Sequence, residues 1–166
     1  MNLAYRRESV GHPLDGFGLV VPAVERRRII ACSFSSVKFT RRAPDGLVLL
    51  RSFVGGALQQ GLFELGDEAL LKTVHDELAA LLGVRGEPVL ATIRRHARAM
   101  PQYHVGHLGK VAKIERLAAG MPGLFLAGNG FGGTGIPDCI HGGETAAEQA
   151  LARLVTLSRQ QVTARH

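Results

Sequence analysis

The spacing of apolar residues changes part-way along the chain, from short β-type runs to helical periodicity. Runs rich in Val, Ile and Leu lie in the first third, and the pairs Asp15-Gly16 and Asp45-Gly46 between them are typical of turns. Four strands are therefore predicted, at residues 2–7, 17–22, 28–36 and 47–54. Because the links between them are short, we expect these strands to pair antiparallel in one sheet.

The next segment has the pattern of an amphipathic helix. Asp67 is the expected cap, Glu68 lies in the first turn and Gly83 ends the helix. The apolar residues recur on one face and are interpreted as core packing: Leu70, Leu71, Val74, Leu78, Leu81 and Leu82. A further strand is predicted at 88–93 and a shorter helix at 106–118. Strands that come first and helices that follow favour an α+β fold.

A third pattern, strand then glycine-rich loop then helix, follows towards the C-terminus. The apolar run at 124–127 predicts a strand, the loop covers 128–135, and Pro137 and Asp138 open a helix that continues from Cys139 to Leu154. Glycines let a backbone approach a ligand closely, and a helix start presents N–H groups without partners. The pattern therefore predicts a cradle for a phosphate or a cofactor ring, with a tight turn that binds nothing as the alternative.

The same loop does not complete a dinucleotide-binding unit. Gly128, Gly130 and Gly133 satisfy G-x-G-x-x-G after a predicted strand, but that unit also needs a second strand after the helix, with an acidic residue on it. The helix is followed here by a polar and basic stretch, with a tail expected at 158–166. A self-contained Rossmann unit is therefore not expected.

Composition is that of a globular piece, with 46% hydrophobic and 20% charged residues. The two cysteines form no disulfide framework, which predicts a reduced, cytoplasmic protein. The net charge of +6 comes from scattered basic residues, and no series of aromatic residues accompanies them. Nucleic acid is therefore not expected as a partner, whereas anionic lipid or the carboxylates of a ligand are.

Two blocks near the C-terminus have a distinctive sequence, Gly-Leu-Phe-Leu-Ala-Gly-Asn at 123–129 and Gly-Ile-Pro-Asp-Cys-Ile at 135–140. Further blocks precede them at residues 12–22, 32–36, 38–44, 49–56 and 99–107. In this order the blocks resemble the C-terminal portion of oxygen-dependent protoporphyrinogen or coproporphyrinogen oxidases, in the flavin amine oxidase superfamily, and the first two are similar to that family's C-terminal flavin motif. The family's N-terminal strand–G-x-G-x-x-G–helix unit has no counterpart in this sequence.

The resemblance implies an FAD site with few side chains of this chain in it. The backbone of Thr134, Gly135 and Ile136 is expected at the flavin ring. Gly128 and Asn129 are expected near the ribityl and pyrophosphate groups, although Asn129 equally suits a turn.

Three further residues of this site are expected from the same resemblance. Pro137 and Asp138 start the helix, and Asp138 either caps it or contacts ligand. His96 stands where many relatives have a Trp that packs beside the cofactor.

Other functional groups are expected to be few. Phe17 is the one substrate-side residue that the resemblance implies. No catalytic residue is expected, because the flavin carries the oxidation. His104 and His107 form an H-x-x-H pair without a third ligand, so no metal site is predicted.

The resemblance also implies a division of the chain and a set of partners. Residues 1–97 are expected to be part of a substrate-binding domain with an antiparallel sheet. Residues 98–157 are expected to be the C-terminal part of an FAD-binding domain. The implied activity is oxidation of a porphyrinogen in haem biosynthesis, and the implied partner is an N-terminal FAD-binding half. A second copy and a membrane surface are further candidate partners. A fragment unable to bind FAD alone, and part of another amine-oxidase-type flavoprotein, remain the alternatives.

Overall fold

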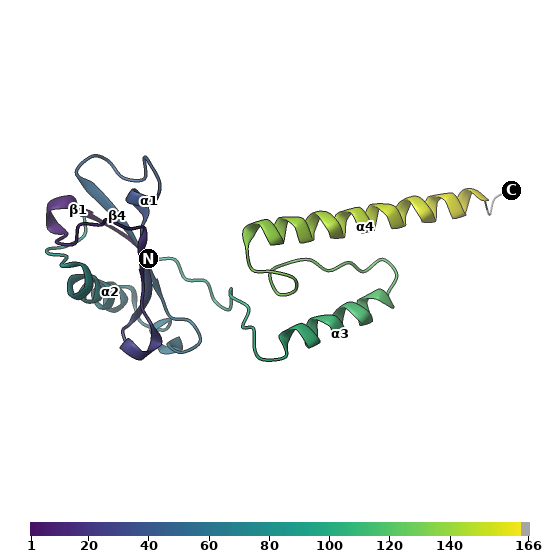
Figure 1. Ribbon diagram of the computed structural model, residues 1–166, viewed down its shortest axis with the longest axis horizontal. Coiled ribbons are helices and arrows are strands. Elements are labelled where there is room, and N and C mark those ends of the chain that lie inside the picture. The colour runs from purple at the N-terminus through teal and green to yellow at the C-terminus, as the bar shows by residue number, and fades with distance from the viewer. Residues whose placement is uncertain (164–166) are drawn as a thin grey trace. The chain divides into compact units, whose positions relative to one another are not determined.

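The computed structural model describes residues 1–163 and has two compact units, Met1–Ala97 and Arg98–His166. The first unit is an antiparallel sheet with a helix packed on it, and the second consists of two helices joined by a long connection (Figure 1). The predicted α+β class is confirmed. Each unit is described by itself below.

The sheet of the first unit has the strand order β2-β3-β4-β1-β5, and every neighbouring pair is antiparallel. The five strands predicted within residues 1–97 all form, although several are shorter than expected. The third ends early because its last residues turn into the short helix α1 (Ser35–Lys38). The strands are β1 (Asn2–Arg6), β2 (Gly18–Val20), β3 (Ile29–Phe34), β4 (Leu47–Val54) and β5 (Leu90–Thr92). Single-turn 3-10 helices occur at Arg7–Ser9, Ala23–Glu25 and Gln60–Leu62.

Helix α2 (Asp67–Leu82) covers one face of this sheet and closes the core. Val74 and Leu78 of the helix are fully buried, and Tyr5 of β1 is buried opposite them. The Tyr5 hydroxyl group lies 3.0 Å from Nδ1 of His75, so the one polar atom of this buried ring has a partner. Burial raises the pKa of Tyr5 above its ordinary value. The helical face that the leucine spacing predicted is the face that packs on the sheet.

The two ends of α2 are satisfied differently. At the C-terminal end Gly83 adopts a φ of 62°, as the sequence predicted for the stop. The backbone N–H groups of Gly11 and His12 donate to the carbonyl groups of Gly83 and Leu82, which would otherwise lack partners. At the N-terminal end the prediction of an Asp67 cap is wrong: the cap is Gly66, and Asp67 is the first helical residue.

Asp67 instead pairs with Arg95, which follows β5. The guanidinium group of Arg95 donates to the Asp67 carboxylate and to the carbonyl oxygens of Phe63 and Leu65. One side chain thus ties the segment after β5 to the connection that leads into α2.

The second unit contains α3 (His107–Ala119) and α4 (Ile136–Thr163). The predicted strand at 124–127 does not form. Within residues 1–163, the backbone N–H and C=O groups of Phe125, Leu126 and Ala127 form no hydrogen bond with another backbone group. A strand needs a neighbouring strand to satisfy these groups, and the described part of this unit contains none.

Helix α4 is longer than predicted. It begins at Ile136 and continues to Thr163, through the region expected to be a tail. The reason is that neither Gly nor Pro follows Gly143, so nothing in the sequence ends the helix. Residues 164–166 of the expected tail lie outside the described residues.

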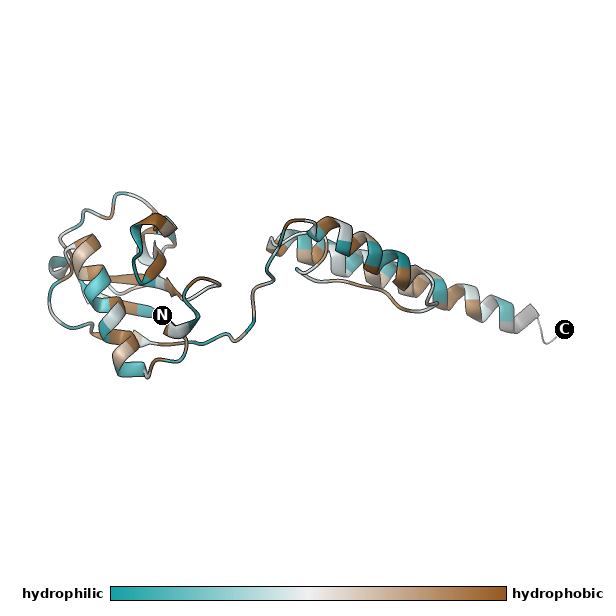
Figure 2. Ribbon diagram, turned by 90° about the horizontal axis from the view of Figure 1, so that it is seen from below, coloured by the Kyte–Doolittle hydropathy of each residue, from teal (hydrophilic) through white to brown (hydrophobic). Residues whose placement is uncertain are grey.

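The second unit buries very little of its apolar surface. Val111 is the one buried hydrophobic residue among its described positions, whereas the first unit has a contiguous core. Apolar residues recur along both helices of this unit and in their connection (Figure 2). Several are largely exposed: Val105, Leu108, Leu117, Ile136, Leu151 and Leu154. A unit of this kind needs a partner surface to bury them.

Candidate functional site

The glycine-rich loop between α3 and α4 leaves its backbone open to approach. Gly128 has a φ of 125°, which residues with a side chain rarely adopt. A Cβ atom added at Gly130 or Gly132 would meet no heavy atom within 4 Å. Packing within the chain therefore does not require these two glycines, and they leave room beside the loop for an external group.

A tyrosine and a histidine hold the start of this loop in place. The Tyr103 hydroxyl group donates to the carbonyl oxygen of Asn129. The His107 ring packs edge-on against Tyr103, with ring centroids 4.5 Å apart. The role of Tyr103 was missed from the sequence, because no local signal links it to a residue so far along the chain.

The carboxylate of Asp138 lies at the start of α4. Its Oδ2 accepts the backbone N–H of Gly135 at 3.2 Å, and it fills the space beside Gly133. Asp138 therefore caps the helix, which was one of the two roles predicted for it. Pro137 has no N–H to offer, as expected in a first turn.

This cap decides which kind of group suits the helix start. A carboxylate already present there repels a phosphate, while the neutral edge of a ring with carbonyl acceptors meets no such repulsion. The donor groups at the start of α4 therefore fit the edge of a neutral ring with carbonyl acceptors better than they fit a phosphate group.

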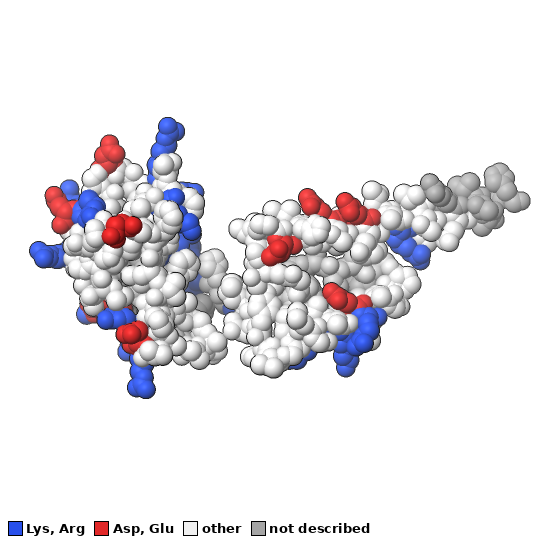
Figure 3. Space-filling model, in the orientation of Figure 1, with Lys and Arg blue, Asp and Glu red and all other residues white. Residues whose placement is uncertain are grey.

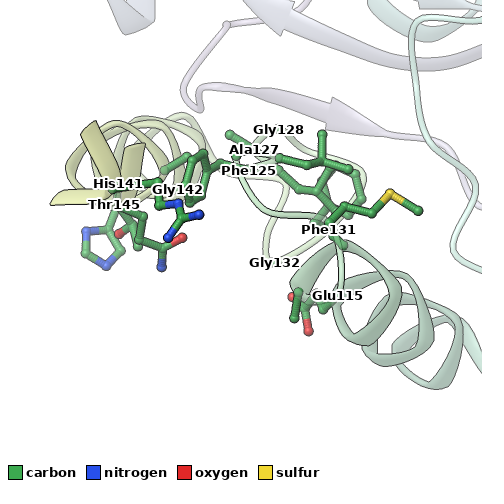
Figure 4. A pocket seen from close by; sticks show the side chains of 18 of the residues that line it. Glu115, Phe125, Ala127, Gly128, Phe131, Gly132, His141, Gly142 and Thr145 are labelled. Carbon is green, nitrogen blue, oxygen red and sulfur yellow. The ribbon is translucent and has the colours of Figure 1, made fainter. Parts of the chain in front are cut away.

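Next to the loop is an open groove with a volume of about 770 Å³. Figure 4 shows Phe125 and Phe131 in its wall, with His141 and Thr145 of α4 on one side and Glu115 of α3 on another. The groove is lined by both helices and by the connection between them, which includes residues 125–127 with their unpaired backbone groups.

The two remaining predicted site residues belong to the first unit. Phe17 is 68% exposed, and its carbonyl oxygen accepts the N–H of Phe34 at 2.9 Å, which fixes the start of β2. His96 is exposed in the segment after β5. The other predicted residues, from Gly128 to Asp138, are gathered in the second unit around the start of α4.

On the face that Figure 3 shows, Lys and Arg are scattered among Asp, Glu and uncharged residues and do not merge into one large basic patch. Within residues 1–163, no group of His, Cys, Asp and Glu side chains is arranged to hold a metal ion. Nor does any helix in that part of the chain have the length and hydropathy to cross a membrane.

The sequence profile of the family described as flavin containing amine oxidoreductase matches residues 2–151. The chain belongs to this family. The predicted membership of the flavin amine oxidases is confirmed.

Two relatives of the chain are named as porphyrinogen oxidases. The chain is 35% identical to coproporphyrinogen III oxidase of Bacillus subtilis, over 92% of this chain and 33% of the relative. It is 32% identical to mitochondrial protoporphyrinogen oxidase of Nicotiana tabacum, over 93% of this chain and 31% of that one. The chain thus spans about a third of the length of these relatives.

A solved structure from Exiguobacterium sp. 255-15, named as a candidate protoporphyrinogen oxidase, has a similar fold. The TM-score is 0.75 at 28% identity, over 92% of this chain and 33% of the other. The similarity therefore extends across the sheet of the first unit and the helices of the second.

Proposed function

We propose that this chain is the C-terminal part of an FAD-dependent porphyrinogen oxidase of haem biosynthesis. The complete enzyme would oxidise protoporphyrinogen IX or coproporphyrinogen III, with oxygen as electron acceptor and hydrogen peroxide as the other product. The observation that carries the proposal is the continuous match to porphyrinogen oxidases over 92% of the chain. In this proposal residues 1–97 belong to the substrate domain and 98–157 to the FAD-binding domain.

The start of α4 would contact the flavin through its backbone. FAD supplies the redox chemistry, since its ring accepts a hydride from an electron-rich carbon. The N–H groups of Thr134 and Ile136 lie beside the first turn of α4, where N–H groups lack helical partners, and would donate to the acceptor edge of the ring. Such donors stabilise negative charge that develops on the ring. Asp138 fixes their position by binding Gly135.

Other residues of the proposed site contribute through packing and backbone conformation. Gly128 lets the chain pass close to the ribityl group, and the carbonyl of Asn129 is held by Tyr103. His96 would pack beside the cofactor, and Phe17 would contact the porphyrinogen.

An N-terminal FAD-binding half is the proposed partner. The run at residues 125–127 consists of apolar residues only and has no backbone partner within residues 1–163. Strands that are apolar on both faces are typical of the centre of a parallel sheet. A strand from the N-terminal half would pair with this run and would cover exposed residues such as Leu117 and Leu124. The proposal places the enzyme in the cytoplasm, with its basic charge available for contact with an anionic membrane.

FAD titration tests the proposal. The chain is titrated alone and together with the N-terminal two thirds of a porphyrinogen oxidase, and flavin fluorescence and the visible spectrum report binding. We expect saturable binding, and oxidation of a porphyrinogen to a fluorescent porphyrin, only with both parts present. Absence of flavin binding in the combined sample would contradict the proposal and would favour a fragment without catalytic function. Saturable binding by the chain alone would contradict the need for a partner.

A further inference from the structure

The sheet of the first unit has one face that α2 does not cover. In β4 the buried residues Val48, Leu50 and Ser52 face the core. The residues that alternate with them lie on the opposite face, because successive side chains of a strand point to opposite sides. Among these, Arg51 is exposed and is the one charged residue of the strand.

Arg51 belongs to a row of residues that crosses all five strands and is polar on four of them, here called the polar row. The sheet register places it opposite Asn2 of β1 and opposite Ser33 of β3. Asn2 in turn lies opposite Thr92 of β5, and Ser33 opposite Gly18 of β2. The guanidinium Nε of Arg51 donates to Oδ1 of Asn2 at 3.0 Å, and Nδ2 of Asn2 is 3.4 Å from Oγ1 of Thr92. These bonds orient the guanidinium group through Nε alone.

The two terminal nitrogens of Arg51 have no carboxylate partner within residues 1–163. None of the five strands contains an acidic residue, and the ion pairs in the described part of the chain involve other arginines and one lysine. A guanidinium group held through Nε presents its other two N–H-bearing nitrogens as a fork that matches a carboxylate.

Apolar residues lie on both sides of the polar row. Val20, Ala31 and Phe53 lie opposite one another on three strands, and Phe53 is 45% exposed. Beyond the row on the other side, Leu49, Ala4 and Leu90 form a second set. The face thus has apolar residues on both sides of the polar row, with Arg51 as the one cationic side chain of that row. This chemistry suits an apolar ligand that carries a carboxylate.

The spacing of the arginines on this face suits single carboxylates better than it suits a polyanion. The other arginine on this face of β1 and β4 is Arg6, four residues along β1 from Asn2, or about 13 Å by strand geometry. A phosphate backbone is bound by closely spaced basic residues, which this face lacks. Single carboxylates on an apolar ring match the arrangement better.

We infer that Arg51 binds a propionate carboxylate of the porphyrinogen and positions the tetrapyrrole on the open face of the sheet. The inference rests on the proposed function for the identity of the ligand. Arg51 is a positioning residue for substrate specificity, and the ring system lies against the apolar residues beside it. Replacement of the carboxylates by uncharged groups removes the attraction but leaves the apolar contact.

The test measures porphyrin affinity of the full chain by fluorescence and Soret absorbance. The probes are coproporphyrin III, a tetracarboxylic acid, and its tetramethyl ester, both in the same non-ionic detergent buffer. Arg51→Leu is expected to weaken binding of the acid about tenfold and to leave binding of the ester unchanged. Arg51→Lys keeps the charge and should restore most of the affinity. Arg85→Leu removes an exposed arginine outside the sheet and serves as the matched control.

The outcomes separate this inference from the proposed function. If Arg51→Leu binds the acid as tightly as the original chain, or weakens the acid and the ester equally, the inference is wrong. Absence of coproporphyrin binding by the original chain overturns it too. If circular dichroism shows that Arg51→Leu does not fold, the porphyrin affinity of the original chain is measured at low and high salt instead. The inference then requires that the acid bind more weakly at high salt and that the ester bind equally well at both. Failure of the proposed function shows instead as absence of flavin binding with the N-terminal half present.

Discussion

At the scale of single residues, Gly18 is where β2 comes closest to β3. Its φ is 152°, and a Cβ atom at this position would lie 2.3 Å from the carbonyl oxygen of Cys32. Gly18→Ala is therefore expected to lower the free energy of unfolding by about 1–3 kcal/mol, because backbone must move to admit the methyl group. Urea denaturation measures the change. Gly16→Ala is the control, since a Cβ there meets nothing within 4 Å, and an equal loss in both variants would contradict the argument.

Gly132 is the opposite case, a glycine that packing within the chain does not require. Gly132→Val is expected to leave the helical circular dichroism unchanged but to weaken flavin binding about tenfold or more, because the added side chain enters the space of the ligand. The titration is done in the presence of the N-terminal half. Gly61→Val, at another open position, should bind flavin normally. Normal binding by Gly132→Val would remove the loop from the proposed site.

The two cysteines differ in environment. Burial raises the pKa of the Cys32 thiol to about 11, while Cys139 is only partly buried. A thiol reagent at pH 8 should therefore modify Cys139 alone in the folded chain and both residues in denaturant.

The pH dependence of stability follows from the same shift. Since the folded state favours the protonated thiol of Cys32, this contribution to stability is present below the ordinary pKa of 9.0 and is lost as the pH rises towards 11. The thiol reagent checks the same protection of Cys32. If a Cys139→Ser variant still reacted rapidly at pH 8, Cys32 would not be protected by burial.

At the scale of elements, Arg95 joins the segment after β5 to the start of α2. Arg95→Ala is expected to lower the free energy of unfolding by about 1–2 kcal/mol, since two backbone carbonyls and Asp67 lose a charged donor. Arg95→Lys should recover little of this, because an ammonium group cannot reach three acceptors in a fork. Thermal denaturation compares them with Lys72→Ala. Lys72 pairs with Asp76 on an exposed helix surface, so its loss should stay within about 0.5 kcal/mol.

The sequence predicted those elements whose stability is local or depends on nearby strands. The leucine spacing before Gly83 predicted α2, and the β-rich runs predicted the five strands of the first unit. The run at 124–127 has the same local pattern but no neighbour in the described chain, so local pattern alone overestimated it. The prediction that Asp67 caps α2 was wrong, because its carboxylate pairs with the guanidinium group of Arg95.

The candidate site was predictable in the same uneven way. The glycine loop and the capping role of Asp138 follow from glycine and helix-start chemistry, which is local. The contact between Tyr103 and Asn129 joins distant positions and could not be read from the sequence. Arg51 had a visible signal, a single charge in the apolar strand at 47–54, but its partner Asn2 appears only with the strand register.

At the scale of the whole molecule, burial is concentrated in the first unit. All but one of the buried hydrophobic residues in the described chain belong to Met1–Ala97. Hydrogen exchange should therefore be slowest for amides of β1, β3 and β4 and markedly faster for α3 and α4. Addition of the N-terminal half is expected to slow exchange in α3, in α4 and at residues 124–127. Equal protection of both units in the chain alone would show that the second unit is stable without a partner.

The unpaired backbone at residues 125–127 also bears on how a cell must produce this protein. An apolar run whose backbone N–H and C=O groups have no backbone partner within residues 1–163 is a template for pairing with any similar strand, another copy of the same chain included. If the proposed N-terminal half covers this run, chains made in excess of that half would keep the template exposed and become substrates for chaperones and proteases. The proposed function therefore implies that the yield depends on how much of the N-terminal half is made beside this chain.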